Sequence, residues 1–198
     1  ICDALNRDAI ERLRSLKNRK FKPFAVMVKD FETVKRYFSD ELREFFDSPE
    51  APILIVDTVG FLPKSISPLN RKIGFIKAYT PLHQLLFYYL KTEFIIATSG
   101  NLKDEPIVID EETAEEKLSR FTRYFLHHNR PIHNRVDDSV FTIFDNKPYP
   151  IRVSRGFAPI PMITRVFYKD SLFGAGAGLK SHFAMSKGKY IIISQYLG

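Results

Sequence analysis

The sequence predicts an α/β fold followed by the opening strands of a second unit. Short apolar runs rich in β-branched and aromatic residues alternate with stretches of helical spacing, a pattern typical of α/β domains. With 198 residues, 44% of them hydrophobic, the chain can bury the core of one domain and part of another. After Pro159 and Pro161 the pattern changes to short strands and glycine turns without a helix. This change predicts a boundary between two units.

The chain begins with a helix, a basic segment and a strand. Apolar residues recur at helical spacing over residues 6–16, which predicts a helix. Pro23 favours extended backbone before it and opens an apolar strand over residues 24–28. If the segment between them is extended, Lys17 and Arg19 project to the same side, because strand side chains have a period of two. Such a pair of cations suits a polyphosphate.

The next stretch contains a helix with a clear start. Residues 30–46 predict a helix in two pieces, and residues 52–56 predict an apolar strand. Residues 57–73 give weak signals and stay unassigned. Thr80 is a suitable cap and Pro81 a suitable first-turn residue for the helix that follows.

A strand over residues 94–97 leads into Thr98-Ser99-Gly100-Asn101, a loop of small polar residues. Gly100 allows a tight turn or the close approach of a ligand, while Ser99 and Asn101 offer a hydroxyl and an amide to polar groups. The loop therefore suits phosphate or nucleotide. An ordinary turn at the end of a strand is the alternative.

The remaining elements follow the same rules. Asp110 is a suitable cap for a helix whose apolar face extends to Phe125. The later predictions, in chain order, are a hairpin with strands over 140–144 and 149–153, a strand at 172–173, and strands over 182–186 and 190–195. Three short strands are too few to bury a core alone, so the last group indicates the start of a second domain.

The basic charge is concentrated near the start of the chain. The net charge is +7, and the stretch from Arg7 to Lys22 contains seven basic residues and two acidic ones. Such a cluster is either a solvated helix end or an anion site. The sequence lacks a run of aromatic residues alternating with Arg or Lys, the pattern that stacks single-stranded bases. A small anionic ligand is therefore favoured over nucleic acid.

Cysteine and histidine usage favours a metal-free, reduced chain. The single cysteine, Cys2, excludes an internal disulfide and fits a cytoplasmic setting. His127, His128 and His133 lack a carboxylate or cysteine at a familiar ligand spacing, so we expect no metal within the chain. No apolar run reaches membrane-spanning length and no leader precedes the first helix, which predicts a soluble protein.

Several motifs occur in an order typical of one family. They are KNRKFKPFAVM at 17–27, YTPLH at 79–83, TSGN at 98–101, DEPI at 104–107, HNRPI at 128–132, RVDDSV at 135–140 and RGFAP at 155–159. On these motifs, which extend over nearly the whole chain, the sequence resembles the HypF family of carbamoyltransferases in [NiFe]-hydrogenase maturation.

The resemblance implies a particular domain organisation. Residues 1–158 would form a YrdC-like domain, a twisted mixed sheet with flanking helices that lacks its N-terminal part. Residues 159–164 would be a linker, and residues 165–198 the first strands of an ASKHA-like transferase domain. The chain would then be a fragment that does not complete the reaction by itself.

The resemblance also implies an activity. ATP would convert carbamoyl phosphate into carbamoyl adenylate, and the carbamoyl group would pass to the C-terminal cysteine of a HypE-type acceptor protein. Mg²⁺ would share the phosphate charge, whereas zinc or another metal would be held only outside this chain. No catalytic side chain is assigned. The implied nucleotide and phosphate ligands, which we expect around one cavity, are Lys17, Arg19, Thr98, Ser99, Asn101, Ser139 and Arg155.

Two alternatives remain at the level of sequence. A YrdC-type threonylcarbamoyl-adenylate synthase shares the Lys-x-Arg signal and a similar polar loop but uses threonine and bicarbonate. The motifs near Tyr79, Arg135 and Arg155 and the start of a second domain argue against it. A non-catalytic module that binds double-stranded RNA is suggested by the basic charge and would show steep salt dependence.

Overall fold

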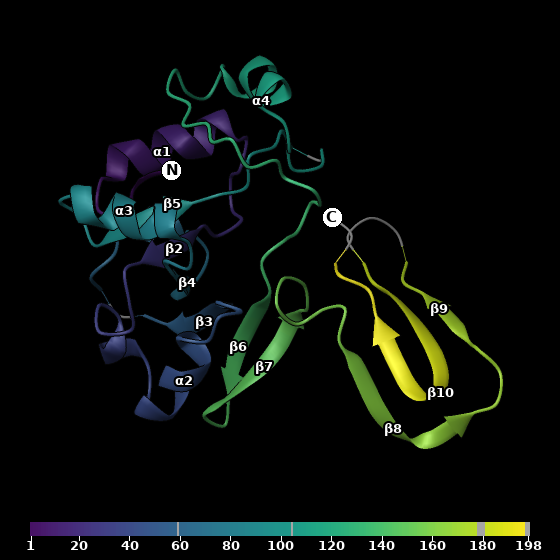
Figure 1. Ribbon diagram of the computed structural model, residues 1–198. Helices are drawn as coiled ribbons and strands as arrows, with labels where there is room; N and C mark the ends of the chain where they lie inside the picture. The colour runs from purple at the N-terminus through teal and green to yellow at the C-terminus, as the bar shows by residue number, and fades with distance from the viewer. Residues whose placement is uncertain (59, 104, 178–180, 197–198) are drawn as a thin grey trace.

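Two separate β-sheets organise the chain (Figure 1). The computed structural model describes residues 1–198 except 59, 104, 178–180 and 197–198. The larger sheet has seven strands in the order β1 (Cys2–Asp3), β5 (Phe94–Ala97), β2 (Ala25–Val28), β4 (Lys72–Lys77), β3 (Ile53–Asp57), β6 (Val140–Phe144) and β7 (Lys147–Arg152). The pairs β2–β4 and β3–β6 are parallel and the other pairs are antiparallel, so the predicted mixed sheet is confirmed.

Helices cover both faces of this sheet. The helices of the described residues are α1 (Arg7–Leu16), α2 (Arg43–Phe46), α3 (Pro81–Tyr89) and α4 (Glu111–Leu118), with the 3₁₀ turns η1 (Lys35–Tyr37), η2 (Asp40–Leu42) and η3 (Lys64–Ile66). None of the residues of α4 is buried. Along β2, Val26 and Val28 belong to one hydrophobic cluster and Met27 belongs to another. Successive strand residues face opposite sides, so the two clusters lie on opposite faces. Ile10 of α1 packs into the first cluster and Phe87 of α3 into the second.

Helix starts follow the local signals. The Oγ1 of Thr80 accepts a hydrogen bond from the His83 N–H, and Asp110 accepts one from the Thr113 N–H. Both caps were predicted from the sequence and are confirmed. α4 ends at Leu118, however, so the predicted continuation of its apolar face toward Phe125 is wrong.

The sequence prediction failed in the middle of the sheet. Strand β4 was missed, although it lies between β2 and β3. It contains Gly74, which looks like a loop residue in the sequence. A Cβ at Gly74 would lie 2.6 Å from the Ile53 Cγ2, so the glycine permits close packing within the sheet. Residues 30–46, predicted as a helix, form short 3₁₀ turns and only one turn of α-helix.

The predicted hairpin is confirmed. Strands β6 and β7 are joined by Asp145 and Asn146, which have φ angles of 50° and 56°. Positive φ at both central residues matches the turn whose twist fits antiparallel strands, and Asn and Asp tolerate that conformation.

The second sheet is formed by β8 (Pro161–Tyr168), β10 (Phe183–Ile193) and β9 (Phe173–Ala175) in that order. β10 folds back on itself near Gly188, where φ is 58°. The two ends of the strand meet, since the Ser194 N–H donates to the Phe183 carbonyl oxygen at 2.8 Å. Its two halves correspond to the last two predicted strands. β8 was not predicted, and it begins at Pro161, within residues 159–164 that were expected to be a linker.

Candidate functional site

Two loops distant in sequence meet at one end of the large sheet. The segment that carries Lys17 and Arg19 precedes β2, and the loop that begins at Thr98 follows β5. These strands are antiparallel neighbours, and Ala25 is paired with Ala97. The start of β2 and the end of β5 therefore lie side by side, which brings the two loops together as the sequence predicted.

Lys17 fastens the polar loop. Its Nζ donates to the backbone oxygen of Ser99 at 2.9 Å, and to the backbone oxygen and Oδ1 of Asn101 at 2.9 and 3.2 Å. The Ser99 hydroxyl also donates to Asn101 Oδ1 at 2.7 Å. An ammonium group has three N–H donors, so in this conformation the loop occupies all of them. Lys17 thus holds the loop in place before any ligand is present.

Arg19 keeps part of its hydrogen-bonding capacity. Its Nη1 donates to Thr98 Oγ1 at 3.3 Å, its Nε donates to the Lys22 carbonyl oxygen at 3.1 Å, and its Nη2 donates to the carbonyl oxygen of Pro23. The guanidinium carbon lies 4.5 Å from the centre of the Phe24 ring. A guanidinium has five N–H donors, so one N–H on each terminal nitrogen is left for another acceptor. This paired arrangement suits two oxygens of a phosphate.

The cations of this group repel one another. The pKa of Lys17 is lowered to about 8, first by burial and then by Arg19 and Lys22. The pKa of Arg19 is lowered to about 10, first by burial and then by Arg14. Within the described residues, no carboxylate forms an ion pair with Lys17 or Arg19. An anion would relieve this repulsion, so the group has the electrostatics of an anion site. We call Lys17, Arg19, Thr98, Ser99 and Asn101 the loop cation group.

Ser139 and Arg155 lie elsewhere. Ser139 precedes β6, which is paired in parallel with β3 from Ile53 onward. The registers of β3 with β4 and of β4 with β2 put Ser139 near the level of Lys77, the last residue of β4. The loop cation group lies beyond the opposite ends of these strands. No hydrogen bond or ion pair recorded for the described residues joins the two groups, so a single shared cavity stays a prediction.

The Ser139 hydroxyl forms hydrogen bonds within the fold. The residue is 0% exposed, its hydroxyl donates to the Arg155 carbonyl oxygen at 3.0 Å and it accepts from the Ser154 N–H at 2.7 Å. In this conformation the hydroxyl has no surface for a phosphate. Instead it joins the entrance of β6 to the segment after β7, a structural role that the sequence analysis did not assign.

Arg155 is largely occupied as well. Its Nη1 donates to the Glu50 carbonyl oxygen at 2.6 Å, and its Nη2 donates to the Ala51 carbonyl oxygen at 2.8 Å. Asp138 Oδ1 accepts from Nη2 at 2.9 Å and from Nε at 3.3 Å. These contacts leave one N–H and supply a counter-charge. Arg155 therefore connects the segment before β3 to the segment before β6.

An aromatic pair completes the surroundings of Arg155. Its guanidinium carbon lies 3.9 Å from the centre of the Tyr79 ring, and the Tyr79 ring meets the His83 ring edge-on at 4.8 Å. Burial lowers the pKa of His83, with a smaller opposing effect of Asp138. The His83 side chain is half-buried.

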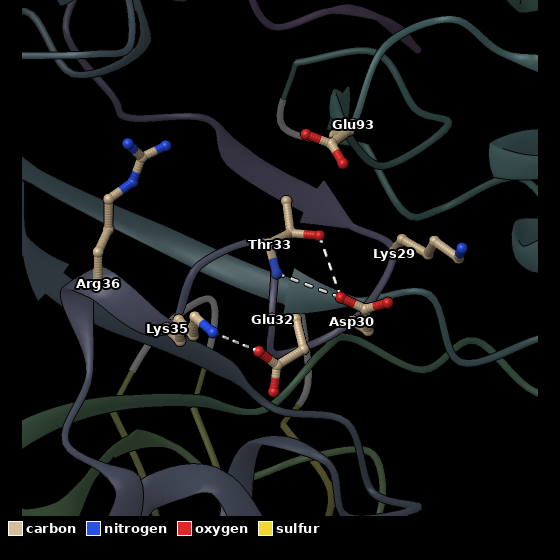
Figure 2. A pocket seen from close by; sticks show the side chains of 7 residues that line it. All are labelled: Lys29, Asp30, Glu32, Thr33, Lys35, Arg36 and Glu93. Atoms are coloured by element: carbon tan, nitrogen blue, oxygen red, sulfur yellow. Dashed lines mark hydrogen bonds and ion pairs between the residues drawn. The ribbon is translucent and has the colours of Figure 1, made fainter.

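A cavity lies at the other end of β2. It measures about 450 Å³, and Lys29, the residue directly after β2, is among the residues that line it (Figure 2). Its lining is mixed in charge, and part of it is already paired: Lys35 donates to Glu32, and Thr33 donates to Asp30. Cations and carboxylates balance there, so this cavity does not share the anion-binding character of the loop cation group. No described cluster of His, Cys, Asp or Glu could hold a metal ion, and no described helix is long and apolar enough to cross a membrane.

Comparison with known proteins establishes the family. The family model of Sua5, YciO and YrdC proteins, described as "Telomere recombination", matches residues 1–154. The chain therefore belongs to this family. The structure of E. coli YciO has a TM-score of 0.63 at 18% identity, and it covers 77% of this chain and 76% of its own, so it shares the fold.

The whole chain is similar to HypF proteins, which confirms the resemblance stated from the motifs. Carbamoyltransferase HypF of Synechocystis sp. is 39% identical over 201 residues, covering 100% of this chain and 26% of the relative. Carbamoyltransferase HypF of Rhodobacter capsulatus is 34% identical over 200 residues, covering 100% and 27%. This chain thus spans 26% to 27% of the length of these relatives.

A crystal structure of full-length HypF in the phosphate- and nucleotide-bound form has a TM-score of 0.90 with this chain. The two are 38% identical, and the match covers 99% of this chain and 31% of that chain. The similarity includes residues beyond the family match at 154, so the small second sheet also follows the HypF structure.

Proposed function

We propose that this chain forms the nucleotide-binding part of a HypF-type carbamoyltransferase. In the proposed reaction, ATP activates the carbamoyl group of carbamoyl phosphate as carbamoyl adenylate. The observation that carries the proposal is the Arg19 guanidinium, which keeps one N–H on each terminal nitrogen beside the Thr98–Asn101 loop and has no carboxylate partner among the described residues. Similarity to HypF along the whole chain supports the same assignment.

The residues suit adenylation. Water hydrolyses carbamoyl phosphate to carbamate and inorganic phosphate, an oxygen of carbamate attacks the α-phosphorus of ATP, and pyrophosphate leaves with the bonding electron pair. Negative charge grows on phosphate oxygens during this displacement. Arg19 would donate to two of these oxygens, and the loop fastened by Lys17 would keep its polar groups in position. No nucleophilic side chain is needed.

Mg²⁺ belongs to the proposal as an ion carried by ATP. The described residues offer no cluster of three or more acidic, histidine or cysteine ligands. Phosphate oxygens and water are ligands that Mg²⁺ accepts readily. The ion would neutralise phosphate charge, while Arg19 and the loop bind the remaining phosphate oxygens. Zinc, expected only outside this chain, has no part in this step.

The later step needs other parts of the protein. We propose that the carbamoyl group then passes to the C-terminal cysteine of a HypE-type acceptor protein, in a transferase domain whose first strands are β8 to β10. The small sheet leaves large apolar side chains exposed, among them Ile163, which is 76% exposed, and Phe167, which is 68% exposed. A sheet with this exposure lacks the packing of a complete domain.

The proposal has a two-part test. Calorimetric titration of the chain with ATP and Mg²⁺ should show binding that weakens in Arg19→Met and persists in Arg12→Lys, because Arg12 is exposed and lies outside the loop cation group. A protein of HypF length that contains this chain should catalyse exchange of labelled pyrophosphate into ATP only with carbamoyl phosphate.

Two results would replace the proposal. Exchange that needs threonine and bicarbonate would identify a threonylcarbamoyl-adenylate synthase. This chain also shares its fold with the structure of P. abyssi Sua5, at 14% identity. Binding of duplex RNA with a steep salt dependence and without ATP binding would identify an RNA-binding module.

A further inference from the structure

Arg14 is a buried cation beside the loop cation group. It lies on α1, is 6% exposed, and has no carboxylate partner among the ion pairs of the described residues. Burial lowers its pKa. A buried charge is costly, and well-packed apolar residues are often at least as stable in its place. The cost indicates a role that depends on the guanidinium.

The guanidinium of Arg14 gathers backbone carbonyl groups from two segments. The first segment is η3 and the second is the stretch that contains Arg19. The acceptors are the carbonyl oxygens of Ser65 at 2.5 Å and Ile66 at 2.9 Å, and those of Arg19 at 2.7 Å, Lys20 at 3.4 Å and Lys22 at 3.2 Å. A planar group with five donors can serve both segments at once, which a lysine ammonium cannot.

Arg14 and Arg19 also share partners. Both donate to the Lys22 carbonyl oxygen, at 3.2 and 3.1 Å respectively. Their guanidinium carbons lie 4.7 and 4.5 Å from the centre of the same Phe24 ring, which is 1% exposed. The backbone and the ring that support Arg19 are therefore held by Arg14. A change at Arg14 reaches Arg19 through these shared partners.

We propose that Arg14 is a positioning residue: its bonds to the carbonyl groups of residues 19–22, together with the shared Phe24 ring, fix the orientation in which Arg19 presents its open N–H donors to a phosphate. This inference rests on the proposed nucleotide site. It assigns Arg14 no contact with the ligand. Its side chain is buried, and four of its acceptors bond at 3.2 Å or less.

The test is a double-mutant cycle on ATP affinity. Arg14→Lys keeps the charge but cannot span both segments, and we expect ATP to bind about tenfold more weakly, the loss of about one charge-assisted hydrogen bond. In the Arg19→Met background the same change should have almost no further effect, because Arg14 acts through Arg19. Arg12→Lys on the exposed face of α1 is the matched control and should leave affinity unchanged.

Hydrogen exchange supplies a readout that needs no nucleotide. In Arg14→Lys, the backbone amides of residues 19–22 should exchange faster, while those of β5 keep their wild-type rates. If Arg14→Lys does not fold, Phe24→Leu serves instead: it removes the shared ring, should weaken ATP binding, and should lose that effect in the Arg19→Met background.

Four outcomes distinguish these roles. An equal loss of affinity in both backgrounds, or a lower melting temperature with unchanged affinity, would show that Arg14 only stabilises the fold and would overturn the inference. Absence of ATP binding in the wild-type chain would refute the proposed function instead. Unchanged exchange at residues 19–22 would refute the inference by itself.

Discussion

Arg19 and Arg155 lie in similar local surroundings at opposite ends of the central strands, yet the fold uses them differently. Each guanidinium lies over an aromatic ring, Phe24 at 4.5 Å and Tyr79 at 3.9 Å. Arg155 bonds the Asp138 carboxylate and two backbone carbonyl groups, and keeps one N–H. Arg19 has no carboxylate partner among the described residues and keeps two N–H groups.

The difference between Arg19 and Arg155 shows that residue type alone does not define an anion site. Both arginines carry a full charge, and both were expected to bind phosphate. A ligand, however, competes with the hydrogen bonds that the fold already makes. The open donors of Arg19 can be used at little cost, whereas Arg155 would first have to release partners. We therefore expect substitutions at Arg155 to affect folding and substitutions at Arg19 to affect binding.

The largest effect is expected from Arg155→Met. Loss of the Asp138 pair and of the bonds to Glu50 and Ala51 should lower the free energy of unfolding by about 3 kcal/mol, because several polar groups lose their partners together. Denaturant unfolding followed by circular dichroism measures the change, with Arg12→Met as an exposed control. A large loss of ATP affinity at unchanged stability would instead make Arg155 a ligand residue.

A smaller loss of stability is expected from Gly156→Ala, at the residue that follows Arg155. Gly156 has a φ of 81°, and an added Cβ would lie 2.5 Å from the Glu50 Cβ and 2.8 Å from its Cα. We expect about 2 kcal/mol of destabilisation from strain and overlap. Gly174→Ala is the control, because among the described residues no atom outside its two chain neighbours lies within 4 Å of the position that an added Cβ would take there. Equal melting temperatures for the two variants would contradict this packing argument.

Arg19→Met should change binding more than folding. The loss of the two donors that we propose bind phosphate oxygens should weaken ATP binding about tenfold, or about 1.4 kcal/mol. Isothermal titration calorimetry measures the affinity, and Arg19→Lys shows how much a point charge restores. If Arg19→Met bound ATP as tightly as the wild type, the distinction between the two arginines would fail.

The smallest effect is a pH dependence of binding. Lys17 has a pKa lowered to about 8, so its ammonium loses its proton as the pH rises past 8, and ATP affinity should fall several-fold between pH 7 and pH 9. Anion binding favours the charged form, so ATP should drive proton uptake near pH 8. Titrations in buffers of different ionisation enthalpy measure this uptake, and Lys17→Met should abolish it.

The lowered pKa of Lys17 also predicts how the free energy of unfolding changes with pH. Lys17 has a lowered folded pKa, so between about 8 and its usual value of 10.5 the unfolded chain binds more protons than the folded chain. The contribution of Lys17 to stability therefore rises with pH across that window. Comparison of unfolding midpoints for the wild type and Lys17→Met at pH 7 and pH 9.5 tests the sign.

Local signals predicted much of the fold. The caps Thr80 and Asp110 were correct, since a side-chain oxygen and an N–H three residues later form a contact that the sequence shows directly. The hairpin was predicted as well, although its turn consists of Asp145 and Asn146 and not of residues 145–148. Strand β4 escaped prediction because Gly74 is explained only by Ile53 on the neighbouring strand.

By itself, the sequence indicated which side chains could bind an anion and, from their shared chemistry, led us to expect Lys17 and the Thr98 loop around one cavity. Only the tertiary structure decided which of these groups keep donors for a ligand. Arg19 remains open and Ser139 is enclosed because their partners come from other strands and loops. Hydrogen-bond donors are few and are satisfied in three dimensions, so their availability depends on contacts that no local pattern contains.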